Sequence, residues 1–133
     1  MLDKIDTEKK LKYLFYFIII IEIPLGLFML IAPDLFKSLL GFPPQDPLMF
    51  GVGASIWLTF GLISILGIRE PMKYVPILLF QFTYKSIWFI GVIIPAAIAG
   101  QIQTSGIFMI ITFAIFVICD IIVIPWNTIF KKE

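Results

Sequence analysis

The sequence contains no histidine and only one cysteine, Cys119, among its 133 residues. Without histidine, the chain lacks the residue that usually ligates haem iron or catalytic zinc, and the base of Ser-His-Asp and Cys-His catalysis. A single cysteine cannot form an internal disulfide, so it carries no information about the redox compartment. From these absences we predict no metal site, no cofactor and no catalytic residue.

Charged residues are also scarce. They make up 14% of the chain, whereas ordinary soluble domains contain about 25%. The net charge of +1 indicates no basic surface, so nucleic acid is not an expected partner. Hydrophobic residues account for 60% of the chain and form unbroken runs of about 20 residues. This composition predicts an integral membrane protein with a single domain.

Four apolar runs are long enough to cross a bilayer, and short polar segments separate them. The first run is longer than the apolar part of a typical signal peptide and no small-residue cleavage site follows it, so we expect it to be retained. We place the four spans at about residues 13–32, 48–67, 74–99 and 106–126.

The segment between the first two spans predicts a short helix at about residues 33–41. Pro33 favours a helix start and Gly41 favours a C-terminal cap. The apolar residues of this segment fall on one face, so the helix should lie in the membrane interface. The expected fold is therefore all-α, an antiparallel bundle of four transmembrane helices with an interfacial helix in the first loop.

Lysine and arginine predict the orientation of the bundle, because cytoplasmic loops carry an excess of both. With both termini in the cytoplasm, only Lys37 falls on the far side. Eight basic residues then fall on the cytoplasmic side: Lys4, Lys9, Lys10, Lys12, Arg69, Lys73, Lys131 and Lys132. We therefore expect both termini to be cytoplasmic.

Small residues recur every four positions in the second span, at Gly51, Ser55 and Thr59. Such residues share a helix face and let another helix approach closely. This face predicts close packing, either within the chain or against a second copy. The alternative is a groove for a ligand or an ion.

Three charged residues lie inside the apolar runs, where a charge is costly. At 1.5 Å per residue, Lys85 lies about 16 Å, Glu22 about 13 Å and Asp120 about 9 Å from the cytoplasmic edge. Helix side chains lean toward the N-terminus, which brings the three groups to one layer. Gln81 and Trp88 share the helix face of Lys85, so we expect these five residues to form one polar centre.

The polar centre has several interpretations. It is an ion pair that fixes the register of the helices, or a polar pocket or proton relay, or a site from which Lys85 reaches a water-filled crevice. The three charged groups sum to −1 if all are ionised, so one acid is expected to carry a proton. A Schiff-base lysine and an intramembrane enzyme are weaker alternatives, because no second catalytic group can be placed.

Several short motifs lie in or beside the apolar runs. They are Pro33-Asp-Leu-Phe36, Leu39-Leu-Gly41, Arg69-Glu-Pro-Met-Lys-Tyr74, Gln81-Phe-Thr-Tyr-Lys-Ser-Ile-Trp88, Asp120 and Ile124-Pro-Trp126. Over most of the chain, these motifs resemble small prokaryotic four-span membrane proteins of the broad DoxX-like type. The resemblance implies four helices, the inner membrane of a prokaryote and an unassigned role. DoxX itself is associated with a thiosulfate:quinone oxidoreductase, but nothing in this sequence carries quinone or sulfur chemistry.

The function that we expect is the binding of a membrane lipid or another small amphipathic ligand, or service as an accessory subunit beside a partner membrane protein. The alternative is an oligomeric proton- or ion-coupled transporter or channel, because four short spans enclose little pore alone. In the binding hypothesis, Lys85 pairs with an anionic head group or with the two acids. The predicted ligand-binding residues are Lys85, Glu22, Asp120, Gln81 and Trp88.

Overall fold

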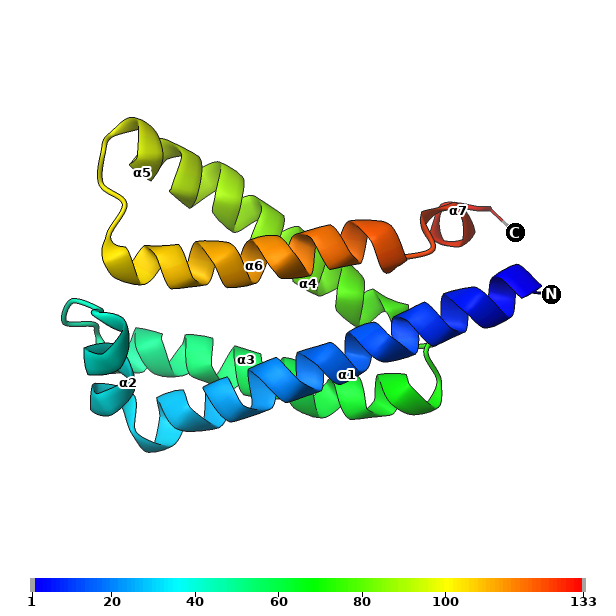
Figure 1. Cartoon of the computed structure of the whole chain (residues 1–133), viewed down its shortest axis with the longest axis horizontal. Coiled ribbons are helices and arrows are strands. Elements are labelled where there is room, and N and C mark those ends of the chain that lie inside the picture. The colour runs from blue at the N-terminus through cyan, green and yellow to red at the C-terminus, as the bar shows by residue number, and fades with distance from the viewer. Residues whose placement is uncertain (1, 133) are drawn as a thin grey trace.

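The computed structural model describes residues 2–132, and these residues form helices and no strand. Figure 1 shows both termini at one end of the molecule, together with the connection between α3 and α4. In chain order the elements are α1 (Leu2–Ile31), α2 (Pro33–Leu40), α3 (Pro47–Arg69), α4 (Val75–Trp88), the π-helix η1 (Phe89–Ile93), α5 (Ile94–Ile98), α6 (Thr104–Val123) and α7 (Trp126–Ile129).

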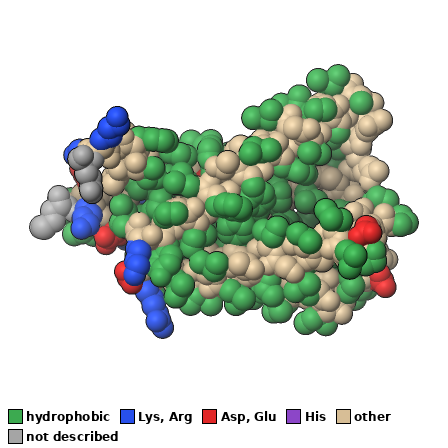
Figure 2. All heavy atoms as spheres, turned by 180° about the vertical axis from the view of Figure 1, so that it is seen from behind, with side chains coloured by type: hydrophobic (Ala, Val, Ile, Leu, Met, Phe, Trp, Pro, Cys, Tyr) green, Lys and Arg blue, Asp and Glu red, His purple; other side chains and the backbone are tan. Residues whose placement is uncertain are grey.

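Four helical segments are long and apolar enough to cross a membrane, as the sequence predicted. They are Leu2–Ile31, Pro47–Arg69, Val75–Ile98 and Thr104–Val123. Many of their large apolar side chains are exposed. Figure 2 shows these side chains over the middle of the molecule, with lysine and arginine gathered at the end that holds the termini.

Two ends of these segments differ from the predicted span bounds by three residues or more. α1 begins at Leu2, because the charged residues that precede the apolar run are helix formers and extend the helix. α6 ends at Val123, three residues before the predicted end of the span. Pro125 disfavours the helical conformation of the residue before it, and Ile124 is accordingly extended. The separate short helix α7 was not predicted.

The predicted helix at 33–41 is confirmed as α2, which Gly41 ends in the left-handed conformation (φ 71°). Its apolar residues do not all share one environment. Phe36 is buried and packs against Phe28 and Phe50, with ring centroids 5.4 and 6.1 Å apart. Leu35 and Leu39 remain exposed. The helix is therefore anchored by one aromatic side chain and presents two leucines outward.

Glycines permit the close approach of α1 and α3. A Cβ atom added to Gly26 would lie 2.7 Å from the backbone nitrogen of Leu58, and one added to Gly67 would lie 2.6 Å from the Phe15 ring. A Cβ at Gly61 would collide with Ile23. Because backbone atoms cannot move aside as easily as the end of a side chain, the seam between α1 and α3 requires small residues.

The third apolar segment changes its helical form before Pro95. The Ile94 N–H donates to the Phe89 carbonyl oxygen five residues earlier, which makes η1 a π-helix. Proline cannot donate a backbone hydrogen bond, and a local π-type adjustment accommodates the missing bond. The helix continues past Pro95 as α5 to Ile98, and Figure 1 shows α5 diverging from α3.

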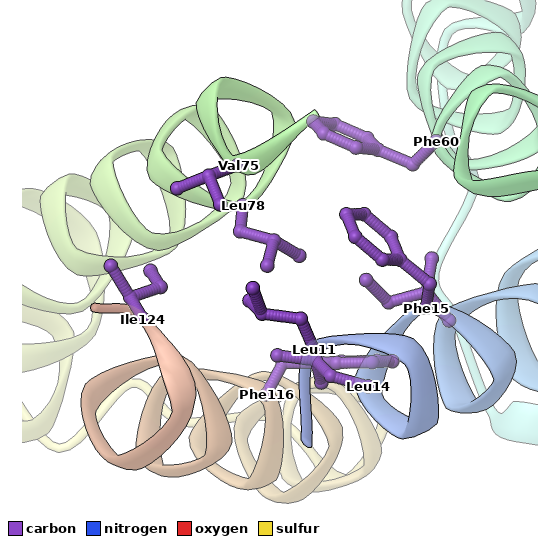
Figure 3. Close-up of a cluster of buried hydrophobic side chains, with 9 residues drawn as sticks. Leu11, Leu14, Phe15, Phe60, Val75, Leu78, Phe116 and Ile124 are labelled. Atoms are coloured by element: carbon purple, nitrogen blue, oxygen red, sulfur yellow. The ribbon is translucent and has the colours of Figure 1, made fainter. Parts of the chain in front are cut away.

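The buried apolar side chains form two clusters along the molecule. The first cluster includes Leu11, Phe15, Leu78 and Phe116 near the end that holds the termini, and Figure 3 shows it between α1, α3, α4 and α6. The second cluster lies toward α2 and consists of Met29, Phe36, Ala54, Trp57 and Phe113. Along α1, Glu22 falls between residues of the two clusters, so the buried charges lie at the junction of the two cores.

Candidate functional site

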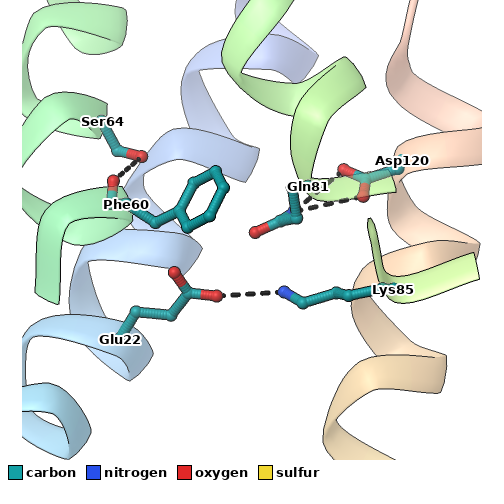
Figure 4. Close-up of polar contacts among 6 residues, drawn as sticks. All are labelled: Glu22, Phe60, Ser64, Gln81, Lys85 and Asp120. Atoms are coloured by element: carbon teal, nitrogen blue, oxygen red, sulfur yellow. Dashed lines mark hydrogen bonds and ion pairs between the residues drawn. The ribbon is translucent and has the colours of Figure 1, made fainter. Parts of the chain in front are cut away.

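The structure places Lys85 of α4 against Glu22 of α1. The Lys85 Nζ atom donates to Glu22 Oε1 over 3.0 Å, and the two side chains are 0% and 2% exposed. Figure 4 shows the pair bridging the space between their helices. The residues are 63 positions apart in the chain. The ion pair therefore links two of the four long helical segments.

Gln81 makes a second link one helical turn before Lys85. Its Nε2 atom donates to both carboxylate oxygens of Asp120, over 3.2 and 3.1 Å, and both side chains are fully buried. This contact joins α4 to α6 (Figure 4). Four of the five predicted residues thus meet in one layer, but they form two separate pairs. Among the described residues, Asp120 has no cationic side chain within ion-pair distance, so the amide is its partner.

Aromatic rings surround the lysine ammonium group. Lys85 Nζ lies 4.0 Å from the centroid of the Phe116 ring, 4.9 Å from that of Phe113 and 5.4 Å from that of Tyr84. The electron-rich ring faces attract a cation, most strongly where water is excluded. Phe113 and Phe116 were not among the residues predicted for the polar centre. The available signal was spacing, because Phe113 and Phe116 lie seven and four residues before Asp120 and share its helix face.

Trp88 is near the polar centre but takes no part in its hydrogen bonds. It is partly buried in the second apolar cluster, where its ring packs against Phe113 with centroids 5.0 Å apart. Phe113 also lies against the Lys85 ammonium group. Trp88 lies close to Lys85, as their shared helix face predicted. The Phe113 ring packs against both residues. The role of Trp88 in binding a ligand stays a prediction.

The polar centre is densely packed, and some of its polar atoms lack partners. The hollow beside Glu22, Trp57 and Phe113 has no volume that admits the centre of a water molecule (0 Å³). Glu22 Oε2, Gln81 Oε1 and the Tyr84 hydroxyl are buried without a hydrogen-bond partner. An unpaired buried polar atom costs about 1–3 kcal/mol, so such atoms are rare and call for an explanation.

A large groove lies between α3 and α4. Its volume is about 740 Å³. It extends from Leu48 to Ile63 along α3, which is about 22 Å at 1.5 Å per residue. The lining residues are Leu48, Gly51, Val52, Ser55, Ile56, Thr59, Phe60, Ile63, Pro76, Ile77 and Phe80.

The small-residue face predicted in the second span lines this groove. Gly51 has open space where a Cβ would lie, and Ser55 and Thr59 are exposed. The Ser55 hydroxyl donates to the Gly51 carbonyl oxygen and the Thr59 hydroxyl to that of Ser55, over 2.8 and 2.7 Å. The face therefore packs against no helix within the described chain. Because both hydroxyl hydrogens are used locally, the groove is apolar in character.

Phe60 belongs both to the groove and to the interior. It lines the groove, yet its side chain is nearly buried and stacks on Tyr84 with ring centroids 5.5 Å apart. In Figure 4 its ring points from α3 toward the space between Gln81 and Glu22. Phe60 therefore borders both the apolar groove and the polar centre.

Comparisons with known proteins found no relative of this chain. The chain matches no family model, no curated protein and no solved structure. Two features of the structure bear on function: a closed polar centre that joins three helices, and an open apolar groove that Phe60 also borders.

Proposed function

We propose that the chain is an integral membrane protein whose four apolar segments form an antiparallel bundle, with both termini in the cytoplasm of a prokaryotic cell. The distribution of charge supports this topology. Basic side chains gather at the end that holds both termini, and apolar side chains cover the middle (Figure 2). Cysteine labelling with a membrane-impermeant reagent tests this topology in a Cys119→Ala background. In that background, Lys131→Cys should react only after the cells are opened, and Ser38→Cys should react in intact cells.

Within this topology, we propose that the protein binds a lipid or another small amphipathic molecule in the groove between α3 and α4. The proposal rests on the groove, which is long, apolar and open. A membrane supplies molecules whose apolar tails match such a groove. Its length of about 22 Å exceeds one leaflet of the hydrocarbon core, which is about 15 Å thick. An extended acyl chain therefore fits along α3.

The proposal changes the expected role of Lys85. In the sequence-based hypothesis this lysine pairs with an anionic head group or with the two acids. Its ammonium group donates to Glu22, and aromatic rings pack around it. The proposal therefore assigns the ligand tail to the groove and not to the polar centre.

Two glycines of α3 provide a matched test of tail binding. Both Gly51 and Gly53 have open space where a Cβ would lie, so a larger side chain is tolerated at either position. Only Gly51 lines the groove. Gly51→Leu should remove a copurifying lipid detected by mass spectrometry, and Gly53→Leu should retain it. Equal lipid content in both variants would count against the groove as the binding site.

An oligomeric proton- or ion-coupled transporter is the second candidate. The row of buried polar residues from Asp120 and Gln81 to Lys85 and Glu22 favours it, because intramembrane ionisable groups often mark ion pathways. Proton or ion flux into liposomes should then depend on Glu22 or Asp120. No flux from a verified oligomer would leave the lipid-binding function as the one to pursue. Kinship with DoxX-like proteins stays a prediction in either case.

A further inference from the structure

The unpaired atoms of the polar centre indicate which head group the site accepts. Glu22 Oε2 and Gln81 Oε1 have no hydrogen-bond partner, and their side chains are 2% and 0% exposed. Both atoms are acceptors, so the missing partner is a hydrogen-bond donor. Figure 4 shows the two oxygens on the side of the centre that faces the Phe60 ring. The same ring borders the groove.

Three nearby side chains of the chain donate to other acceptors, and the buried Tyr84 hydroxyl, which has no partner, makes no hydrogen bond to either oxygen. The Ser64 hydroxyl, which Figure 4 shows beside Phe60, donates to the Phe60 carbonyl oxygen over 2.6 Å. Lys85 donates to the other oxygen of Glu22, and the amide of Gln81 donates to Asp120. Phe60 lines the groove and its ring faces both oxygens, so a donor carried in the groove would approach them past this ring.

We propose that a neutral amphipathic molecule with a hydroxyl head group binds with its tail in the α3–α4 groove, and that displacement of the Phe60 ring lets the hydroxyl donate to Glu22 Oε2 or Gln81 Oε1. This inference rests on the proposed lipid-binding function and specifies its ligand class. A carboxylate or phosphate head would place acceptors against acceptors, whereas an alcohol supplies the missing donor. The Phe60 ring packs against Phe80, which lines the groove and is exposed.

Two probes with the same tail separate head-group recognition from tail binding. Oleyl alcohol has a hydroxyl donor, and oleyl methyl ether lacks it. We expect the purified full chain in detergent micelles, titrated and followed by native mass spectrometry, to bind the alcohol roughly tenfold more tightly, as one net hydrogen bond requires. Equal affinities would overturn the inference while leaving groove binding intact. No binding of either probe would overturn the proposed function as well.

Substitutions of the two acceptor residues test which of them accepts from the ligand hydroxyl. Glu22→Gln keeps an acceptor for Lys85 but can replace the free Oε2 acceptor with an N–H donor, so the preference for the alcohol should decrease. Gln81→Met removes the other acceptor and gives a second measurement if the first variant does not fold. Thr59→Val is the control, because this hydroxyl lines the groove and donates to the backbone. Loss of the preference in Thr59→Val but not in Glu22→Gln or Gln81→Met would overturn the inference.

A ligand with an anionic head group is the alternative, and it predicts a different result. If oleate binds more tightly than oleyl alcohol, and Lys85→Met removes that difference, the head group is an anion that recruits Lys85. This result would overturn the proposed ligand class.

In the Phe60→Ala variant, by contrast, we expect the ratio of ether to alcohol dissociation constants to rise, because the ring no longer separates the groove from the acceptors. An unchanged ratio would show that Phe60 does not control access, and that part of the proposal would fail.

Discussion

Two lysine–carboxylate pairs that involve α1 have the same nitrogen–oxygen distance and opposite surroundings. Lys10 and Asp6 lie 3.0 Å apart with side chains 55% and 62% exposed, and Lys85 and Glu22 lie 3.0 Å apart with side chains 0% and 2% exposed. Water screens the first pair, and neither partner has lost its hydration. In the second pair the attraction is stronger, but both charges have been removed from water. The same distance therefore corresponds to different energetic consequences.

The pairs also differ in what they connect. Asp6 and Lys10 are one helical turn apart, so their interaction acts within α1 alone. Glu22 and Lys85 lie on different helices, and the neighbouring pair of Gln81 and Asp120 extends the connection to α6. The comparison teaches that only the buried pair can influence how the helices are arranged. Breaking each pair in the same way is the direct test.

The largest effect is expected from Lys85→Met, which removes the buried cation and leaves the Glu22 carboxylate unpaired. Breaking a buried pair in this way destabilises proteins by about 3–5 kcal/mol. We expect a loss of this size in the free energy of unfolding, measured by reversible unfolding in mixed detergent–SDS micelles. Far-ultraviolet circular dichroism should show the helices retained before the transition.

The control for this variant removes both members of the pair. Lys85→Met combined with Glu22→Leu removes both charges of the pair, and apolar replacement of a buried ion pair is often neutral or stabilising. The double variant should therefore recover most of the lost stability. If it is as unstable as Lys85→Met alone, the loss comes from the packing of Lys85 among the aromatic rings and not from the orphaned carboxylate.

An intermediate effect is expected from Asp120→Leu, which leaves the Gln81 amide without its acceptor. An unsatisfied buried donor costs about 1–3 kcal/mol, so this variant should be less stable than the wild type by that amount in the same unfolding measurement. Asp120→Asn keeps an acceptor oxygen at the same position and is the matched control. If Asp120→Asn destabilises the chain as much as Asp120→Leu, the carboxylate charge matters more than the hydrogen bond.

Much of this arrangement could be predicted from the sequence. Apolar runs gave four helices of spanning length, and Gly41 marked the end of α2. Counting residues along each run placed Glu22, Lys85 and Asp120 at similar depth, and these residues do lie in one layer. Depth follows from the fixed rise of a helix, so it requires no knowledge of how the helices pack.

The pairing itself could not be predicted, because it depends on how each helix is rotated about its axis. The sequence predicts two acids near Lys85, namely Glu22 and Asp120. The packing of the helices makes Glu22 its partner. Contacts such as that of Gly26 with the Leu58 backbone orient α1 against α3, and they become visible only when both helices are in place. The groove was missed for the same reason. Its small-residue face was recognised, but the divergence of α4 from α3 is a tertiary feature.

The smallest effect is expected from Lys10→Met, the same substitution made in the exposed pair. Exposed pairs of this spacing contribute about 0.3–0.5 kcal/mol, and salt weakens them. At 1 M salt the screening length is about 3 Å, so the small loss should vanish in uncharged detergent, as should that of the partner variant Asp6→Leu. The loss caused by Lys85→Met should persist at the same salt concentration, because solvent ions do not reach the buried carboxylate. If salt instead removed the effect of Lys85→Met, the polar centre would have to be open to water, and the ligand class inferred from its unpaired acceptors would lose its basis.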